Sequence, residues 1–264
     1  MKKIYFAIIA LMATLAVSAQ STKKYVDLAL PSGTLWATCN VGASKPEEYG
    51  DYFAWGETKP KENYDWSTYK WRDGSSDKQT KYCASGIYHT VDKTELDPED
   101  DAATANWGSN WQMPSLDQIK ELYNSSYTIT EWTTQNGVKG YKITSKKNGK
   151  SLFLPAAGFR DRRWLSTAGS HGSYWSRSLY KVYNYYYDYA YYLLFDLAYL
   201  GWSYDSRYYG YSVRPVRSKE KVTTSINSVV ANQKATKNGK FISGGNLVIV
   251  KDGKKYNANG MEIR

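Results

Sequence analysis

The residues best suited to chemistry in this chain of 264 residues are tyrosines, and they concentrate in one stretch. Thirteen of its 26 tyrosines lie between Tyr180 and Tyr211, among Asp, Asn, Ser and Gly residues. A core strand cannot bury so many phenol hydroxyls without a hydrogen-bond partner for each. Tyrosine mixed with small polar residues is instead typical of binding surfaces. The stretch therefore predicts molecular recognition; a tyrosine-rich β segment without a ligand is the alternative, because edge strands also favour tyrosine.

An alternating pattern within this stretch indicates which side chains face outward. Tyr191, Leu193 and Phe195 occupy every second position, as in a strand with one buried face. We therefore expect these three to point inward, and we expect Trp202 and Arg207 to be held in the scaffold. The residues expected to face solvent on one surface and contact a ligand are Tyr180, Tyr183, Tyr185, Tyr187, Tyr189, Tyr192, Tyr204, Asp205, Tyr208 and Tyr209.

Candidate catalytic groups are few by comparison. The chain has two histidines, His89 and His171, and it contains no zinc-protease, serine-hydrolase, dinucleotide-binding or P-loop motif. Two pairs of acids are candidates for a glycosidase, although nothing in their spacing distinguishes them from solvated carboxylates: Asp51 with Glu57, and Asp100 with Asp101. We therefore expect no enzymatic activity, no cofactor and no bound metal.

The first 19 residues have the pattern of a signal peptide. Lys2 and Lys3 precede an apolar segment over 4–17, and Val17-Ser18-Ala19 forms a small-residue cleavage site. The mature protein is then expected to begin at Gln20. The apolar segment is short for a membrane span, and an uncleaved N-terminal anchor is the alternative. We expect a secreted or cell-surface protein without a stable membrane span.

The chain has two cysteines, Cys39 and Cys83. Export to an oxidising compartment permits a disulfide between them. The alternative is a pair of buried thiols, which pack as small hydrophobic side chains. The sequence leaves both alternatives open.

The formal net charge of +10 is unevenly distributed along the chain. Residues 218–264 contain nine Lys or Arg residues against three acids, whereas 20–217 contain 24 basic and 22 acidic residues. The larger part of the chain is therefore nearly neutral. Because nucleic-acid binding requires a basic surface, we expect no nucleic-acid partner.

Composition divides the chain into a main domain over 20–217, a polar linker over 218–245 and a short β tail over 246–264. Short strands in the tail bury little apolar area, which favours a docking or sorting role for it.

In the main domain, Asp97 and Pro98 predict a helix start, and Ser115 with Gln118 predicts a capping box. Asn148-Gly149 predicts a hairpin turn. The acidic residues over 97–101 could also hold Ca²⁺, but they lack EF-hand spacing, so capping is favoured. A few early helices and many late strands predict an α+β domain.

Several short motifs occur in a characteristic order along 25–217. They include YVDL at 25–28, PSGTLWA at 31–37, YFAWGE at 52–57, WQMP at 111–114, FLPAAG at 153–158, YWS at 174–176 and SVRPV at 212–216. Together they resemble the Fibrobacter succinogenes major paralogous (FISUMP) domain family of secreted bacterial proteins. The resemblance implies a C-type-lectin-like fold in its formylglycine-generating-enzyme variant. The catalytic cysteine pair of that enzyme has no counterpart here, so the resemblance implies a fold without its activity.

The tyrosine-rich stretch is also similar to the variable proteins of diversity-generating retroelements, in which an error-prone reverse transcriptase rewrites adenines in Asn-type codons. Tyr, Asp, Ser, Gly and Leu are all reachable from such codons. Residues of these types stand at 192, 194, 196, 204–206, 208–209 and 211. The C-terminal tail resembles the short tails of exported Bacteroidota proteins, which implies a sorting role.

Together, these patterns predict an exported or surface-displayed binding protein without enzymatic activity. Its Tyr-rich face, which the retroelement similarity implies is diversified, would contact a protein or glycan at the cell surface. Two alternatives stay open. The first is a carbohydrate-active enzyme, and the second is a structural surface or adhesin subunit whose tyrosines make subunit contacts.

Overall fold

The computed structural model describes residues 23–73, 79–85, 90–91, 93–180, 188–219, 239–243, 246–252, 254–257 and 261–263. The chain divides into two compact units, Met1–Arg217 and Ser218–Arg264. The expected signal peptide lies outside the described residues, as does most of the expected linker. Among the described helices, none is long and apolar enough to cross a membrane.

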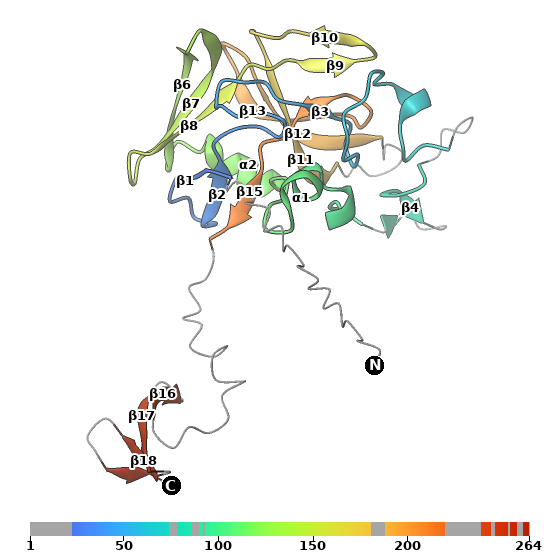
Figure 1. Ribbon diagram of the computed structural model, residues 1–264. Coiled ribbons are helices and arrows are strands. Elements are labelled where there is room, and N and C mark those ends of the chain that lie inside the picture. Colours follow the sequence, from blue (N-terminus) through green and yellow to red (C-terminus); the bar gives the residue numbers. More distant parts are fainter. Residues whose placement is uncertain are drawn as a thin grey trace, which may run out of the picture. The chain divides into compact units, whose positions relative to one another are not determined.

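The first unit is built mostly from strands, so the expected α+β class is wrong (Figure 1). Its two described α-helices are short: α1 (Ala102–Trp107) and α2 (Leu116–Leu122). Two 3₁₀ turns, η1 (Trp66–Thr68) and η2 (Pro98–Asp100), add little to the helical content. The Ser115–Gln118 capping box marked a real helix start, but a cap specifies where a helix begins and not how far it continues.

The strands of the first unit form five described sheets, mostly antiparallel. Their bounds are β1 (Tyr25–Asp27), β2 (Thr34–Ala37), β3 (Tyr52–Phe53), β4 (Ala84–Ser85), β5 (Thr90–Val91), β6 (Thr128–Gln135), β7 (Val138–Ser145), β8 (Ser151–Pro155), β9 (Phe159–Asp161), β10 (Trp164–Ser166), β11 (Gly172–Leu179), β12 (Tyr189–Phe195), β13 (Leu200–Ser206), β14 (Tyr211–Ser212) and β15 (Val216–Ser218). The largest sheet has five strands in the order β13-β12-β11-β14-β3.

Both faces of this five-stranded sheet are covered. One face packs into a first core that contains Trp55, Trp107 and Trp175. The other face packs into a second core, in which Ile119 of α2 meets Phe195 of β12. Neighbouring residues of one strand therefore enter different cores, because successive side chains of a strand point to opposite faces.

Two buried arginines tie loops and strands together in the first unit. The Arg207 guanidinium lies 4.8 Å from the centre of the Trp55 ring, and its Nε donates to Tyr69 Oη at 2.8 Å. Arg214 Nε donates to Asn40 Oδ1 at 2.8 Å, and its Nη1 donates to the Phe153 carbonyl at 3.0 Å. The burial of Arg207 confirms its expected place in the scaffold.

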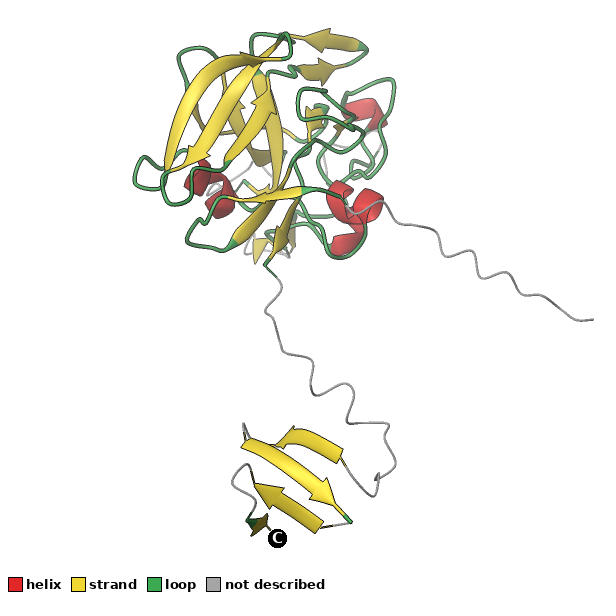
Figure 2. Cartoon of the chain, turned by 60° about the vertical axis from the view of Figure 1, so that its left-hand side comes forward, coloured by secondary structure: helices red, strands yellow, loops and turns green. Residues whose placement is uncertain are grey.

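The second unit is a four-stranded antiparallel meander (Figure 2). It contains β16 (Gly239–Ser243), β17 (Asn246–Lys251), β18 (Lys254–Asn257) and β19 (Glu262–Ile263). The sequence divided this region into a linker over 218–245 and a β tail over 246–264, whereas β16 lies within the expected linker and pairs with β17. The polar composition of 218–245 as a whole concealed the apolar residues Phe241 and Ile242 of this strand.

Candidate functional site

Five aromatic side chains gather at the end of the β12–β13 hairpin, and we call them the aromatic cluster. They are Tyr180, Tyr189, Tyr191, Trp202 and Tyr204. Tyr180 stacks on Tyr204 with ring centres 3.8 Å apart, and Tyr191 meets the edge of Trp202 at 5.4 Å. The exposed fraction is 41% for Trp202 and 44% for Tyr204. Large apolar rings are thus held together at the protein surface.

Strand register explains why these rings share one face. Tyr191 stands directly opposite Tyr204 in the β12–β13 pair, and Trp202 stands two residues before Tyr204 on β13. Side chains two residues apart on a strand point to the same side. On this side the second core covers Leu193 and Phe195, but Tyr191 is only half-buried. The cluster therefore begins where the second core ends.

The structure corrects the expected direction of several side chains. Leu193 and Phe195 point inward as expected, and both belong to the second core. Tyr192 is wrong as a solvent-facing residue, because it is 6% exposed and packs against Trp175 and Tyr211 in the first core. The sequence pattern assumed one solvated face, whereas β12 is an inner strand with a core on each side.

Trp202 and Tyr191 were also misplaced by the sequence interpretation. Trp202 was expected in the scaffold, and it is instead exposed on β13, at the edge of its sheet. Tyr191 was expected to point fully inward and is half-buried. Both belong to the cluster although neither was among the expected contacts. The spacing of Trp202 and Tyr204, two residues apart, was the signal that could have found Trp202.

The remaining expected contacts do not form one face with the cluster. Asp205 is half-buried and accepts hydrogen bonds from Tyr211 Oη at 2.8 Å and from its neighbour's backbone N at 2.7 Å; burial raises the pKa of its carboxyl group. Tyr208 meets Trp66 at 4.9 Å, and Tyr209 meets Phe159 at 5.5 Å, in a separate aromatic group. Three further expected contacts lie outside the described residues: Tyr183, Tyr185 and Tyr187.

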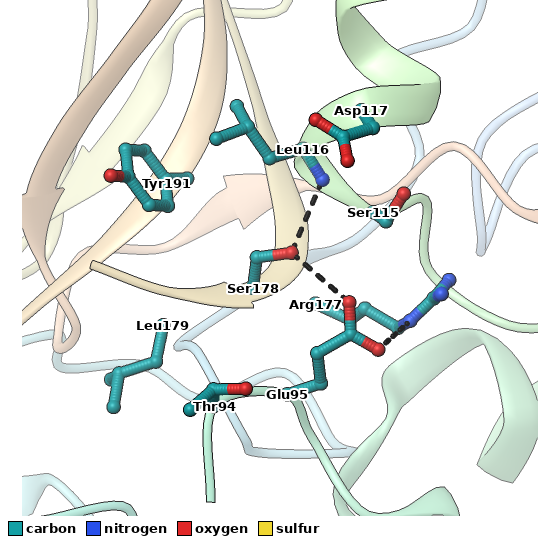
Figure 3. A pocket seen from close by; sticks show the side chains of 9 residues that line it. All are labelled: Thr94, Glu95, Ser115, Leu116, Asp117, Arg177, Ser178, Leu179 and Tyr191. Atoms are coloured by element: carbon teal, nitrogen blue, oxygen red, sulfur yellow. Dashed lines mark hydrogen bonds and ion pairs between the residues drawn. The ribbon is translucent and has the colours of Figure 1, made fainter. Parts of the chain in front are cut away.

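An open pocket of about 290 Å³ adjoins the cluster (Figure 3). Its lining consists of Thr94, Glu95, Ser115, Leu116, Asp117, Arg177, Ser178, Leu179 and Tyr191. Tyr191 belongs to both features, since its ring also contacts Tyr180 at 5.0 Å and Trp202 at 5.4 Å. The cluster and the pocket are therefore continuous through this one side chain.

Hydrogen bonds fix the polar wall of the pocket. Arg177 Nε donates to Glu95 Oε2 at 2.9 Å, and Ser178 Oγ donates to Glu95 Oε1 at 3.4 Å. The backbone N of Leu116, at the start of α2, donates to Ser178 Oγ at 3.1 Å. The segment before η2 runs beside β11, where Leu179 N donates to the Thr94 carbonyl at 2.9 Å. Three separate segments thus position the pocket.

The acidic residues considered as a glycosidase pair have structural roles. Asp101 caps α1, accepting from the backbone N of Ala103 at 2.8 Å and of Thr104 at 2.9 Å. Asp100 is buried and bonded to Lys70. Glu57 is buried against Lys61, whose Nζ lies 2.8 Å from its carboxylate, while Asp51 is exposed. These contacts stabilise carboxylates in the fold and do not present a facing pair to a substrate.

The acidic residues before α1 also lie close together. The carboxylates of Asp97, Glu99 and Asp100 are mutual neighbours, and Lys81 Nζ lies among them at 2.7, 3.6 and 2.5 Å. The lysine supplies the positive charge that a cation would bring, and the hydrogen bond from Lys81 lowers the pKa of Asp97. Asp97 itself makes no capping hydrogen bond, so the expected cap is wrong at Asp97, and Asp101 makes the cap of α1 instead.

A serine, a histidine and an aspartate also meet at the surface. Ser170 Oγ lies 2.9 Å from His171 Nδ1, and His171 Nε2 lies 3.7 Å from Asp196 Oδ2. However, Ser170 Oγ donates to the Thr167 carbonyl at 2.9 Å, and Asp196 accepts from two backbone N–H groups of its own turn. These residues stabilise two surface turns and do not form an activated nucleophile. His89 lies outside the described residues.

The two cysteines are not joined by a disulfide. Cys39 is buried in the first core, and its Sγ donates to the Ala43 carbonyl at 3.4 Å. The sequence left open a disulfide or a pair of buried thiols, and Cys39 is a buried thiol.

No family model matches this chain, and neither a curated protein nor a solved structure matches it. The chemistry of the site therefore carries the functional assignment. That site combines exposed aromatic rings with a polar pocket, and no histidine or cysteine of the described segments lines the pocket.

Proposed function

We propose that this chain is an exported, surface-displayed binding protein without enzymatic activity, and that its ligand contacts the aromatic cluster. The observation that supports this proposal is the exposure of Trp202 and Tyr204 within a set of mutually packed rings. Exposed, contiguous aromatic groups are typical of interaction sites, and Trp and Tyr are enriched among the residues that dominate binding energy.

The packing of the rings on one another also favours binding. Tyr180, Tyr189 and Tyr204 contact one another, and β12 pairs with β13 along its whole length from Tyr189 to Phe195. Side chains that are already ordered lose little further rotamer entropy when a ligand arrives. The cluster is thus pre-organised in the free protein.

The similarity of the stretch to retroelement-diversified proteins supports a second part of the proposal, which is that the face varies between copies of the gene. Tyr204 lies at the surface, where replacement leaves both cores intact, whereas Tyr192 and Tyr211 are buried in the first core. Variation is therefore expected at 204 and restricted at 192 and 211. The check is genomic: a neighbouring reverse-transcriptase gene and a near-copy of the segment with Asn-type codons. Absence of both would contradict diversification.

The direct test of binding replaces three rings of the cluster, the exposed Trp202 and Tyr204 and the half-buried Tyr189. Purified protein is applied to glycan and surface-protein arrays, beside a variant with Tyr189, Trp202 and Tyr204 all changed to Ser. Loss of a central aromatic contact costs about 2 kcal/mol or more, so we expect the variant to lose its array signal. A matched control changes three exposed aromatic residues outside the cluster to Ser: Tyr25, Tyr127 and Trp164.

Three other outcomes would each indicate a different binding surface or function for this protein. Signal lost only in the control variant would place the ligand on another surface and would contradict the proposal. Release of product from an array glycan by the wild-type protein would indicate a carbohydrate-active enzyme. Concentration-dependent self-association, abolished by the cluster variant, would indicate a structural subunit.

Export is tested by cell fractionation with N-terminal sequencing. A mature protein that begins at Gln20, outside the inner membrane, is the expected result. A full-length cytoplasmic product would contradict export.

A further inference from the structure

The pocket beside the aromatic cluster offers hydrogen-bond donors and acceptors side by side. Nε and Nη1 of Arg177 donate to Glu95, Met113 and Gln118, so its Nη2 is the donor offered to a ligand. Glu95 supplies carboxylate acceptors, and Thr94 and Ser115 supply hydroxyl groups that donate and accept. In Figure 3 the Glu95 carboxylate lies between Arg177 and Ser178, bonded to both. Such a lining suits ligand groups that can donate and accept at once.

The charges of the lining disfavour ionic ligands. Each acid of the lining already has a cationic partner, since Glu95 is paired with Arg177 at 2.9 Å and Asp117 with Lys120 at 3.4 Å. Arg177 has only 18% of its side chain exposed and is bonded to Glu95, so it is already neutralised. Because the charged groups of the lining are paired, an ionic ligand of either sign would lose its hydration without gaining an ion pair. A neutral ligand with several hydroxyl groups satisfies both kinds of partner without this cost.

Apolar groups complete the lining on the side next to the cluster. The Tyr191 ring and the side chains of Leu116 and Leu179 line the same space as the polar groups. An aromatic ring packs well against a ligand whose C–H bonds form an apolar face. At about 290 Å³, the pocket is near the lower end of the usual range for small-molecule sites, roughly 300–1,000 Å³.

We infer that this pocket binds one unit of a neutral saccharide, with the hydroxyl groups bonded to Glu95 and Arg177 and the C–H face of the sugar ring against Tyr191. This inference rests on the proposed binding function and names its ligand class. The rings of Tyr180 and Trp202 both contact the Tyr191 ring. The rest of the glycan would therefore continue from Tyr191 onto these two rings.

The test uses the full-length mature protein and free sugars. Saturation-transfer NMR is recorded with glucose, galactose, mannose and N-acetylglucosamine, each at up to about 10 mM, which exceeds a dissociation constant of roughly 1 mM. Glucuronic acid, N-acetylneuraminic acid and glucosamine serve as charged comparisons. We expect at least one neutral sugar to bind, with saturation strongest on the C–H protons of one ring face, and the charged sugars to bind about tenfold more weakly or not at all.

Glu95→Gln is the informative variant, since the amide keeps the shape and an acceptor oxygen but removes the charge. It should weaken binding of the neutral sugar about fivefold or more, because a hydroxyl group bonds more strongly to a charged carboxylate than to a neutral amide. Glu131→Gln is the matched control, as Glu131 is an exposed carboxylate on β6 outside the pocket, and it should leave sugar binding unchanged. An unchanged thermal transition in both variants shows that each is folded.

Failure of this inference differs from failure of the proposed function. If no neutral sugar binds, or Glu95→Gln binds as the wild type does, the pocket is not a saccharide site. The same holds if only glucosamine or a charged sugar binds. The array signal of the wild type and its loss in the cluster variant would still support the binding function. Tyr204→Ser should lower the affinity for the array ligand and leave the affinity for the free sugar unchanged, because Tyr204 does not line the pocket.

Discussion

Tyr192 and Tyr204 belong to paired strands, yet they have opposite environments. Tyr192 fills the first core between Trp175 and Tyr211, whereas Tyr204 lies on the surface in the aromatic cluster. The phenol ring serves both places because it joins a large apolar body to one polar group. At the residue scale, whether a tyrosine contributes to folding stability or to binding therefore depends on which parts of the protein cover its ring.

Replacing each tyrosine by Ser separates the two roles. Tyr192→Ser leaves a cavity in the first core and should lower the free energy of unfolding by about 3 kcal/mol or more. Tyr204→Ser should change it by only about 0.5 kcal/mol, as is usual for surface positions. Urea denaturation at one pH measures both. Equal effects in the two variants would contradict the described burial.

Asp205 provides a pH-dependent prediction. Burial is the largest cause that raises its pKa above 3.8, so the folded protein holds the Asp205 proton more tightly than the unfolded chain does. The stability that this proton contributes is present below pH 3.8 and is lost as the pH rises through the raised pKa of the folded state. Asp205→Asn removes the titration, while the amide oxygen can still accept from Tyr211 Oη.

The measurement is the difference in thermal transition temperature between Asp205→Asn and the wild type as a function of pH. This difference should favour the variant increasingly from about pH 4 upward and then level off once the wild-type carboxyl group is ionised. A difference that does not vary with pH would mean that Asp205 has no raised pKa in the folded protein.

At the scale of the elements, short helices are held by their ends. The Asp101 carboxylate accepts from Ala103 N and Thr104 N of α1 and also from Met113 N at 2.7 Å, beyond the helix. One side chain thus joins the start of α1 to the strand-like segment that precedes α2. A helix of six residues is not stable by itself in water, so α1 depends on tertiary contacts such as these.

Asp101→Ala is therefore expected to destabilise the protein by about 2–3 kcal/mol. It removes a helix cap and leaves the Met113 N–H, which is buried, without its partner. Asp117→Ala is the matched control, because Asp117 lies in the first turn of α2 with its side chain 93% exposed. The control should shift stability by less than about 0.5 kcal/mol. Denaturant midpoints compare the two, and similar losses would contradict the capping role of Asp101.

At the scale of the whole molecule, the two units have separate interiors. Both large cores consist only of residues from the first unit, and the second unit has its own four-stranded sheet. A chain that ends after Lys219 keeps all of β15 and should therefore retain the thermal transition of the first unit, within about 2 °C. A clear loss of stability would contradict the independence of the first unit.

The same shortened chain tests the sorting role proposed for the tail. It should fold and be exported but fail to reach the cell surface, as measured by surface labelling of intact cells. Normal surface display of the shortened chain would contradict a sorting role.

Local signals in the sequence determined where some elements begin and where one hairpin turns. Ser115 and Gln118 form the predicted capping box of α2, and the turn with Gly149 at φ +71° joins β7 to β8 as Asn148-Gly149 predicted. Asp97 was a less accurate signal, because Asp101 caps the helix four residues later. Such features depend on a few neighbouring residues, so they can be predicted from one sequence.

Only the tertiary structure decided what covers each face of β12. A period of two shows that Tyr191, Leu193 and Phe195 share a face, but it does not show how far a second layer extends over that face. Here the second core covers Leu193 and Phe195 and leaves Tyr191 half-buried beside the pocket. The first core covers Tyr192 on the opposite face. Burial depends on segments distant in the sequence, such as α2 and the Trp55 region. The composition of the stretch therefore located the tyrosine-rich segment but could not show which of its rings form the aromatic cluster.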